Sequence, residues 1–329
     1  MLVFFFRKTL SWLRKFNHRP LLYIMVKASE TITPNQLSVA VNHRLPRNVK
    51  KRIIKEIDIS HSDLRASQRG RKFVERMMEA TLYKDMNGIS YDRLKNLVDP
   101  FLPMAKRSLE KNVQSIRLAL RRWSASILTP VNLNILERRA SKQREVNSFK
   151  KPNIWADTTE FRMTGKVSTS TKDASYSYKV RGPGRKWLFL HDAAGRVIYC
   201  GGPRSPKTFD GDFFLLHLRE VEQTFPGATI IADNHFRKAE KEAVKVTLLT
   251  PISRAGRPRL VASKKQKRNL TDEQERWNSD VSKIRGRVEA PYGEWQQRFQ
   301  ALQGPFGEGE DQLDCLVRTA AAVHRLSKA

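Results

Sequence analysis

Three acidic residues in the second half of the chain lie where a carboxylate is unusual. Asp157 falls within a predicted strand, and Asp233 ends the apolar run that begins at Thr229. A carboxylate in a strand that is otherwise buried costs free energy unless a cation compensates its charge. Glu289 lies on the predicted polar face of a long helix, one turn after Arg285, and Tyr292 is assigned to the same face. These positions make the three acids the candidates for chemistry.

Three carboxylates from two strands and a helix can hold two divalent cations about 3.5–4 Å apart, the spacing used for in-line attack on a phosphodiester. Mg²⁺ (or Mn²⁺) suits such a site, because carboxylate, water and phosphate oxygens are hard ligands. Sequence separation alone does not distinguish Asp157, Asp233 and Glu289 from ordinary capped or salt-bridged acids. Arg285 either holds Glu289 or meets a DNA phosphate, or it forms a simple intrahelical ion pair.

The elements that must position these acids change in character near residue 150. Residues 45–148 are predicted as helices with basic faces, most clearly at 108–128, where Arg117 lies off the apolar stripe and is predicted to be solvated. Another helix begins at the N-cap Ser90 and ends before Pro100. Residues 137–151 are predicted as a polar linker. We therefore predict a basic, poorly ordered arm at 1–40, a helical DNA-binding domain at 41–150 and a catalytic domain at 151–329.

From Pro152 onward the pattern is one of short strands and amphipathic helices. Strands are predicted at 153–161, 176–180, 187–191, 197–200, 228–233 and 246–251, with a turn at Asp192 and a helix capped by Asp210. A long helix begins at Thr271, where Gln274 completes a capping box, and a final helix covers 311–326. This order predicts an α/β fold, an RNase H-like catalytic domain with a mixed central sheet flanked by helices, preceded by an all-helical basic domain.

The charge balance restricts the class of partner. The chain has 62 Lys and Arg against 33 Asp and Glu, a net charge of +29. Such an excess raises the energy of the compact state unless a polyanion relieves it, and nucleic acid is the commonest polyanion. Charge alone leaves open a ribosomal-type or membrane-surface basic protein. No apolar run approaches the roughly 20 residues of a membrane helix, so no membrane partner is predicted.

Two further segments bear on function. Cys200 and Cys315 are the two cysteines and form no CxxC pair, which argues against a zinc site or a disulfide scaffold. Residues 253–269 contain no acid and are predicted as a flexible loop that either grips DNA or is merely solvated. Its basic residues are Arg254, Arg257, Arg259, Lys264, Lys265, Lys267 and Arg268. Residues 1–29 are also acid-free, and are a mobile arm or translated upstream sequence, with a targeting segment as the alternative.

Several motifs occur together around the three acids. They are Asp157-Thr158-Thr159, the strand–turn–strand at 187–200, the strand end Ala232-Asp233, and Arg285-x3-Glu289-x3-Gly293 followed by Arg298-Phe299. Over roughly residues 150–325 they resemble the DDE superfamily endonuclease domain of Harbinger-type eukaryotic transposases and related bacterial insertion-sequence transposases. The resemblance implies that Asp157 and Asp233 are the catalytic aspartates and Glu289 the closing glutamate. Some bacterial relatives carry a Tyr and a Lys on this helix where the chain has Ser282 and Gln296.

The resemblance also implies an activity and partners. The activity is metal-dependent cleavage at double-stranded DNA ends, followed by transfer of the freed 3′-hydroxyl into target DNA. The alternative is a domesticated, non-catalytic DNA-binding protein, and a structural RNA-binding protein is disfavoured because no RNA module is recognisable. A separate DNA-binding partner protein and a homo-oligomer both stay open. We expect a nuclear location if the chain is eukaryotic and a nucleoid location if it is bacterial.

Overall fold

The computed structural model describes residues 31–57, 70–128, 131, 133–141, 154–165, 175–252 and 270–328. The chain divides into two compact units, Met1–Leu120 and Arg121–Ala329. The division falls within helix α7 (Lys106–Ile127), and the functional boundaries at 40/41 and 150/151 stay predictions. Within the described ranges, no helix combines the length and the apolar character that crossing a membrane requires.

The regular secondary structure described in unit 1 is all helical. Thr33 forms a capping box with Gln36, so α3 begins inside the segment predicted as an arm. The Ser90 hydroxyl accepts a hydrogen bond from the Arg93 amide at 3.3 Å, which confirms the predicted cap of α6. The helices of unit 1 are α3 (Pro34–Arg44), α4 (Arg47–Glu56), α5 (Arg71–Asn87), α6 (Tyr91–Val98) and the first part of α7.

The predicted solvent exposure of Arg117 is wrong. Arg117 lies in the core of unit 1, where its Nε donates to an Asp85 carboxylate oxygen at 3.2 Å. Asp85 belongs to α5, so this buried ion pair joins α5 to α7. Periodicity placed Arg117 off the apolar stripe correctly, but it could not supply the carboxylate that lets a guanidinium be buried.

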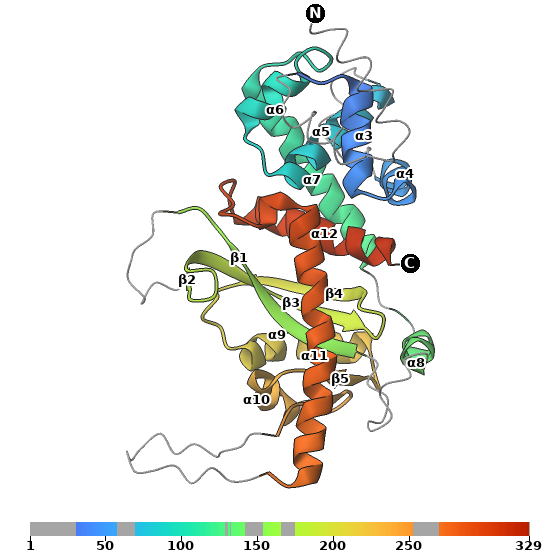
Figure 1. Ribbon diagram of the computed structural model, residues 1–329, viewed down its shortest axis with the longest axis vertical. Helices are drawn as coiled ribbons and strands as arrows, with labels where there is room; N and C mark the ends of the chain where they lie inside the picture. Colours follow the sequence, from blue (N-terminus) through green and yellow to red (C-terminus); the bar gives the residue numbers. More distant parts are fainter. Residues whose placement is uncertain are drawn as a thin grey trace, which may run out of the picture. The chain divides into compact units, whose positions relative to one another are not determined.

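Unit 2 is built on a mixed sheet, which confirms the predicted mixed α/β class (Figure 1). Its central strand, β1 (Ile154–Arg162), pairs antiparallel with β3 (Gly182–Asp192) and parallel with β5 (Thr229–Ile231). β3 also pairs with β2 (Tyr176–Ser177) and with β4 (Val197–Arg204), while β5 pairs with β6 (Thr247–Leu249). Helix α8 (Leu133–Ser141) precedes the sheet, so residues 137–141 of the predicted linker are helical.

Helices cover both faces of this sheet. On one face, Ile154 and Ala156 of β1 share a buried core with Phe213 and Phe214 of α9. The opposite face is covered by α11, which contacts β1, and by α12, which contacts β4. The remaining elements of unit 2 are α9 (Asp210–Thr224), η2 (Asn234–Phe236), α10 (Arg237–Glu240), α11 (Asp272–Arg298), η3 (Gln300–Leu302) and α12 (Glu310–Ser327).

Two acids that were predicted as structural have different outcomes. Asp192 is a turn residue, as predicted, and its carboxylate accepts hydrogen bonds from the Ala194 and Arg196 amides at 2.9 Å each. Asp210 is not an N-cap, because Phe209 holds that position. The Asp210 carboxylate instead accepts from the hydroxyl of Thr158 and the ammonium of Lys186, each at 2.8 Å. It therefore ties α9 to the sheet.

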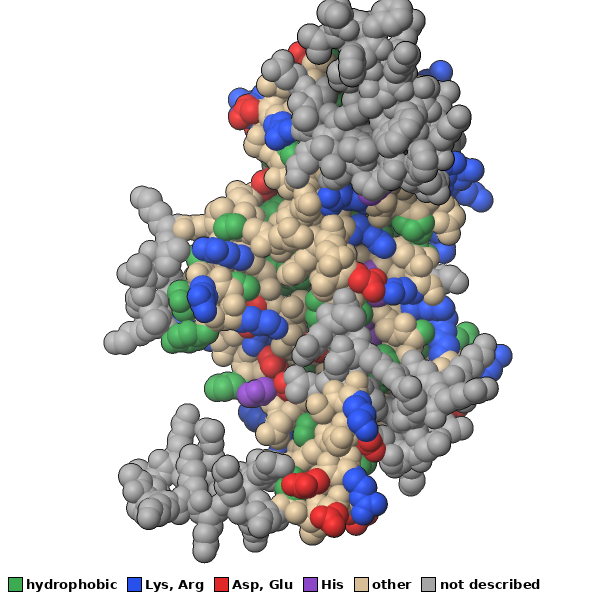
Figure 2. All heavy atoms as spheres, viewed as in Figure 1, with side chains coloured by type: hydrophobic (Ala, Val, Ile, Leu, Met, Phe, Trp, Pro, Cys, Tyr) green, Lys and Arg blue, Asp and Glu red, His purple; other side chains and the backbone are tan. Residues whose placement is uncertain are grey.

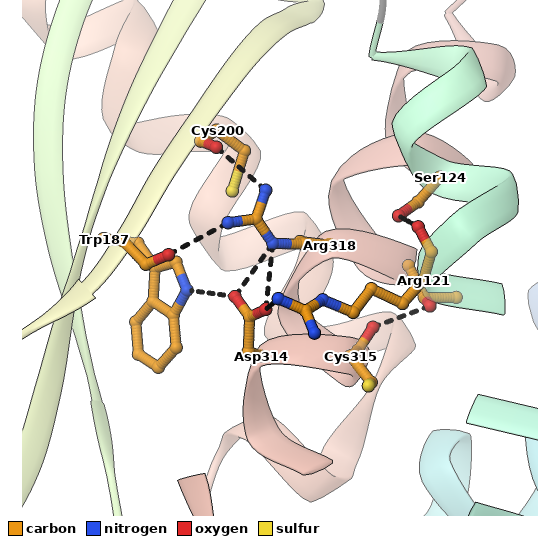
Figure 3. Close-up of polar contacts among 9 residues, drawn as sticks. Arg121, Ser124, Trp187, Cys200, Asp314, Cys315 and Arg318 are labelled. Atoms are coloured by element: carbon orange, nitrogen blue, oxygen red, sulfur yellow. Dashed lines mark hydrogen bonds and ion pairs between the residues drawn. The ribbon is translucent and has the colours of Figure 1, made fainter. Parts of the chain in front are cut away.

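Asp314 of α12 is the centre of a buried polar network that fastens the helix to the sheet (Figure 3). Its carboxylate accepts from the Trp187 indole at 3.1 Å, from Arg318 Nε at 2.9 and 3.0 Å, and pairs with Arg121 at 2.9 Å. The Arg318 guanidinium donates in addition to the carbonyls of Cys200 at 3.0 Å and Gly202 at 2.9 Å. Each polar group of the network therefore depends on the others.

Replacing Asp314 should destabilise unit 2 strongly. In Asp314→Ala the Arg318 charge and the Trp187 N–H keep their buried positions without a carboxylate, so we expect a loss of about 3–5 kcal/mol in the free energy of unfolding. Urea unfolding followed by tryptophan fluorescence reports on unit 2, since every tryptophan after Trp12 lies in it. The control is Asp311→Ala, an exposed acid on the same helix, with an expected loss below about 1 kcal/mol. Equal losses in both variants would contradict the role of the network.

Candidate active site

The pairing of β1 with β5 places Asp157 and Asp233 at the same level. The last pair in this parallel register joins Trp155 to Ile231, and each aspartate comes two residues later on its own chain segment. Neighbouring strands lie about 4.8 Å apart. The register therefore gives the two aspartates matching positions on neighbouring chain segments, with Asp157 within β1 and Asp233 just past the carboxyl end of β5.

Both aspartates belong to the sheet face that α11 covers. Asp157 is the cross-strand partner of Phe189, and directly opposite residues of an antiparallel pair share a face. The Phe189 ring packs on α11. On β5, Ile230 and Ala232 belong to the core on the opposite face, so strand alternation assigns Asp233 to the α11 side.

Asp233 is also fixed through its backbone surroundings. Its carboxylate accepts a hydrogen bond from the His235 amide at 2.7 Å and thereby caps η2. Helix α9 passes close by, since a Cβ at Gly211 would lie 2.8 Å from the His235 carbonyl oxygen. Only glycine allows this approach. The residue is 9% exposed, so its carboxylate is restricted to one narrow position at the edge of the sheet.

Helix α11 begins beside the carboxyl end of β6. The capping box predicted at Thr271 and Gln274 is confirmed, with the Thr271 hydroxyl accepting from the Gln274 amide at 3.3 Å. Asn278 binds the backbone of Ile252 in both directions, donating at 2.9 Å and accepting at 2.7 Å. The Trp277 indole donates to the Thr250 carbonyl at 3.3 Å. These contacts fix the first half of the helix.

Further along, α11 is anchored on β3 by two aromatic residues. The Trp295 ring lies 4.8 Å from that of Phe189 in an edge-to-face arrangement and stacks on His191 at 6.3 Å. The Tyr292 ring lies 5.6 Å from both Phe189 and His191, and its hydroxyl is 3.3 Å from the His191 Nε2. All four side chains are buried. This cluster fixes the second half of the helix.

Between its two anchors, α11 crosses the strands that carry the aspartates. The sheet order is β3-β1-β5-β6, so a helix that runs from β6 to β3 passes over β5 and β1. Glu289 lies in this crossing stretch, three residues before Tyr292, and positions three apart are neighbours on a helix surface. The side chains of Arg285 and Glu289, like residues 253–269 with their seven basic residues, lie outside the described part of the structure.

The described acids fit a divalent cation but do not complete a site. Among the side chains that the structure describes, no group of three His, Cys, Asp or Glu residues could hold a metal ion, and Glu289 is not one of them. Asp157 and Asp233 supply hard oxygen ligands of the kind that Mg²⁺ prefers. A third acid on the crossing stretch of α11 would complete such a donor set.

The anchoring residues were missed in the sequence. Tyr292 was assigned to the polar face of the helix with Glu289, but it is 8% exposed and packs on the sheet. His191 ends the strand predicted at 187–191, and no role in the site was predicted for it. A tyrosine one turn after an acid candidate gives no sign of its packing partner, because that partner lies about a hundred residues earlier in the chain. The spacing of Tyr292 and Trp295 was the available signal.

Burial changes the protonation of two histidines beside these anchors. Burial, helped by the proximity of His324, lowers the pKa of His191 to about 3. Burial also lowers the pKa of His324 to about 4, against the opposing attraction of Glu294. His324 packs on Trp295, with ring centroids 5.7 Å apart. Both imidazoles are therefore neutral at physiological pH.

This protonation makes the stability of unit 2 depend on pH. In the unfolded chain histidine takes up a proton near pH 6.5, whereas folded His191 and His324 do so only near 3 and 4. The unfolded state therefore binds more protons between these values, and stability should fall as pH falls from 6 to 4.5. His191→Gln should reduce this slope by up to about 1.4 kcal/mol per pH unit. Urea unfolding at several pH values measures it, and His235→Gln, at an exposed position, is the control.

Comparison with known proteins agrees with this geometry. Residues 156–325 match the family described as DDE superfamily endonuclease. No curated protein and no solved structure matched the chain. The matched range begins one residue before Asp157 and includes Asp233, all of α11 and nearly all of α12. Because the match covers more than half of the 329 residues, the chain belongs to the DDE superfamily of endonucleases and transposases.

Proposed function

We propose that the chain is a metal-dependent transposase that cleaves DNA ends and joins them to target DNA. Family membership supports a nuclease or transposase function, with DNA as substrate. We assign unit 2 to the RNase H-like class, because β1 lies between the antiparallel strands β3 and β4 and the parallel strands β5 and β6. Helices on both faces of the sheet agree with that class.

In this proposal Asp157, Asp233 and Glu289 hold two divalent cations, Mg²⁺ or Mn²⁺. When bound, such a pair activates the attacking oxygen and stabilises the leaving oxygen of the phosphodiester. The residues of the chain position the reacting groups. The register of β1 with β5 aligns the two aspartates, and the anchors of α11 place the third acid above them. Arg285, four residues before Glu289, pairs with that carboxylate or meets a phosphate.

One observation supports the proposal most directly. Asp157 and Asp233 occupy matching positions in the register of β1 with β5, and both belong to the sheet face that α11 covers. A structural role explains one buried acid at a time, through a cap or an ion pair. It does not explain two aspartates at matching positions on neighbouring chain segments, beneath a helix that carries a third acid. A divalent cation bound between two such carboxylates would offset their mutual repulsion.

The rest of the chain supplies DNA affinity in this proposal. The net charge of +29 gives unit 1 and the basic residues of 253–269 (Arg254, Arg257, Arg259, Lys264, Lys265, Lys267 and Arg268) the role of neutralising phosphates at the transposon end and target. A homo-oligomer or a separate DNA-binding protein would bring two ends together. A nuclear or nucleoid location follows from the substrate.

Each of the three acids should be required for cleavage and dispensable for binding. Asp157→Asn, Asp233→Asn and Glu289→Gln keep the side-chain shape, and Asn at 233 still provides the oxygen that caps η2. Loss of several kcal/mol of metal-dependent stabilisation should lower Mg²⁺-dependent nicking of cognate DNA ends more than about 100-fold. Duplex affinity should be unchanged or slightly higher, because a negative charge is removed.

The control for the cleavage experiment is Glu242→Gln, an exposed acid outside the site, which should cut normally. Wild-type protein that binds cognate ends and does not cut them in Mg²⁺ or Mn²⁺ would establish the non-catalytic, DNA-binding alternative instead. Cutting by the Asp157→Asn variant at the wild-type rate would refute the assignment of that residue.

DNA binding should weaken steeply with salt. A protein that meets about 6–10 phosphates loses about 10³–10⁵ in affinity between 50 and 200 mM salt. Deleting residues 253–269 should flatten the plot of log affinity against log salt by about 0.9 for each phosphate that the loop no longer neutralises. Exchanging the four Arg and three Lys of this loop for one another preserves its charge and should preserve the slope. An unchanged slope after deletion would assign the phosphate binding to other basic regions of the chain.

A further inference from the structure

The turn that joins β2 to β3 presents an aromatic ring among exposed cations. Tyr178 is 70% exposed, and Lys179 and Arg181 are exposed beside it. Neither Lys179 nor Arg181 forms a hydrogen bond or ion pair with another described residue. Figure 2 shows hydrophobic and basic side chains side by side over the position of β2. A ring this exposed adds little to the folded core and is free to contact a partner, and the cations beside it favour an anionic one.

The turn is held firmly at its base. The buried Ser177 hydroxyl donates to the Glu160 carboxylate of β1 and accepts from the Val180 amide at 3.1 Å. Gly184 allows close packing, since a Cβ there would lie 3.2 Å from both the Phe161 carbonyl oxygen and the Val180 side chain. The turn therefore presents its side chains from a fixed backbone, which lowers the entropy cost of binding.

The position of the turn relates it to the aspartates. β2 pairs with Gly182 and Pro183 of β3, and β3 pairs with the last residue of β1, Arg162, at Gly184. The turn therefore extends beyond the carboxyl end of β1, the direction in which β5 also ends. Arg162 comes five residues after Asp157, about 17 Å along the strand. A few nucleotides of DNA span that distance.

The chemistry of the turn fits an unpaired nucleotide. A tyrosine ring stacks on any free base, and neighbouring cations bind the phosphates on either side of it. Inside a duplex the base faces are covered by their neighbours, so an aromatic ring gains most stacking on unpaired bases. Tyr176 stands nearly perpendicular to Tyr178, with centroids 5.3 Å apart, and restricts its ring. No acidic residue occurs between Ser175 and Lys186 to repel a phosphate.

We propose that the turn Tyr178–Arg181 binds an unpaired nucleotide of the DNA end, with Tyr178 stacking on the base and Lys179 and Arg181 meeting its phosphates. This inference rests on the proposed function, because it assumes that the substrate is DNA that is opened at its end. It adds a specific preference for DNA with a single-stranded overhang, carried by a surface separate from the three acids.

The test compares binding of a blunt duplex and of the same duplex with a short overhang that contains 2-aminopurine. The full chain is used without divalent metal, so cleavage plays no part. Tyr178→Ala should weaken overhang binding about 5- to 150-fold, the value of one base–aromatic stack, and should abolish the quenching of 2-aminopurine. Blunt-duplex affinity should change less than about twofold, and Tyr178→Phe should retain stacking because the ring is preserved.

Matched variants separate stacking from general effects. Leu216→Ala removes another exposed apolar side chain, 60% exposed on α9, and should leave both affinities unchanged. Lys179→Ala with Arg181→Ala should reduce the salt slope of overhang binding by about 1.4, since a single strand contributes about 0.7 for each neutralised phosphate. The exposed pair Arg219→Ala with Lys241→Ala is the charge control.

Equal weakening of blunt and overhang DNA by Tyr178→Ala, or failure of Tyr178→Phe to bind as wild type, would overturn the proposal. These outcomes are independent of catalysis. Overhang preference without any cutting would leave the turn assignment in place and refute the proposed enzyme activity, while cutting without overhang preference would do the reverse.

Discussion

The arrangement of unit 2 depends on how α11 is held across the sheet. Asn278 fixes the helix at the end of β6, and Tyr292 fixes it on β3. About 21 Å of helix separate these residues, whereas three strand spacings amount to about 14 Å, so the helix must cross obliquely. The two anchors restrict where the crossing stretch of the helix can lie, although Pro291 removes one backbone hydrogen bond just before the second anchor. The position of the Glu289 backbone is thus determined by helix contacts that lie before and after it.

The two level aspartates create an electrostatic requirement that the surrounding fold has to satisfy. Neighbouring carboxylates repel one another, so their charges have to be compensated by hydrogen bonds, by cationic groups or by a bound cation. The sheet tolerates this because β1 and β5 are fixed by packing on the opposite face, where Ala156 and Ala232 are buried. The α9 face contributes apolar packing, while the α11 face carries both the buried aromatic cluster and the candidate acids.

Sequence patterns predicted the local features well and the partners of buried polar groups poorly. The caps at Ser90 and Thr271 and the turn at Asp192 follow from backbone hydrogen bonding within a few residues, so local sequence was enough to predict them. Arg117 and Tyr292 were misassigned because their partners come from distant segments. For the candidate site, the acids could be identified by residue type and position. The alignment of Asp157 with Asp233 could not be predicted, because it follows from the register of β1 with β5, which no local pattern encodes.

Both cysteines are buried where α12 packs on β4, so thiol labelling can report on the opening of this contact. Burial raises the pKa of the Cys200 thiol to about 12, so the reactive thiolate is scarce while the fold is intact. Cys315 is buried on α12 itself. A thiol reagent should therefore modify the folded chain much more slowly than the unfolded chain. The rate of alkylation then reports how often this interface opens. Cysteine labelling therefore measures local unfolding between α12 and β4.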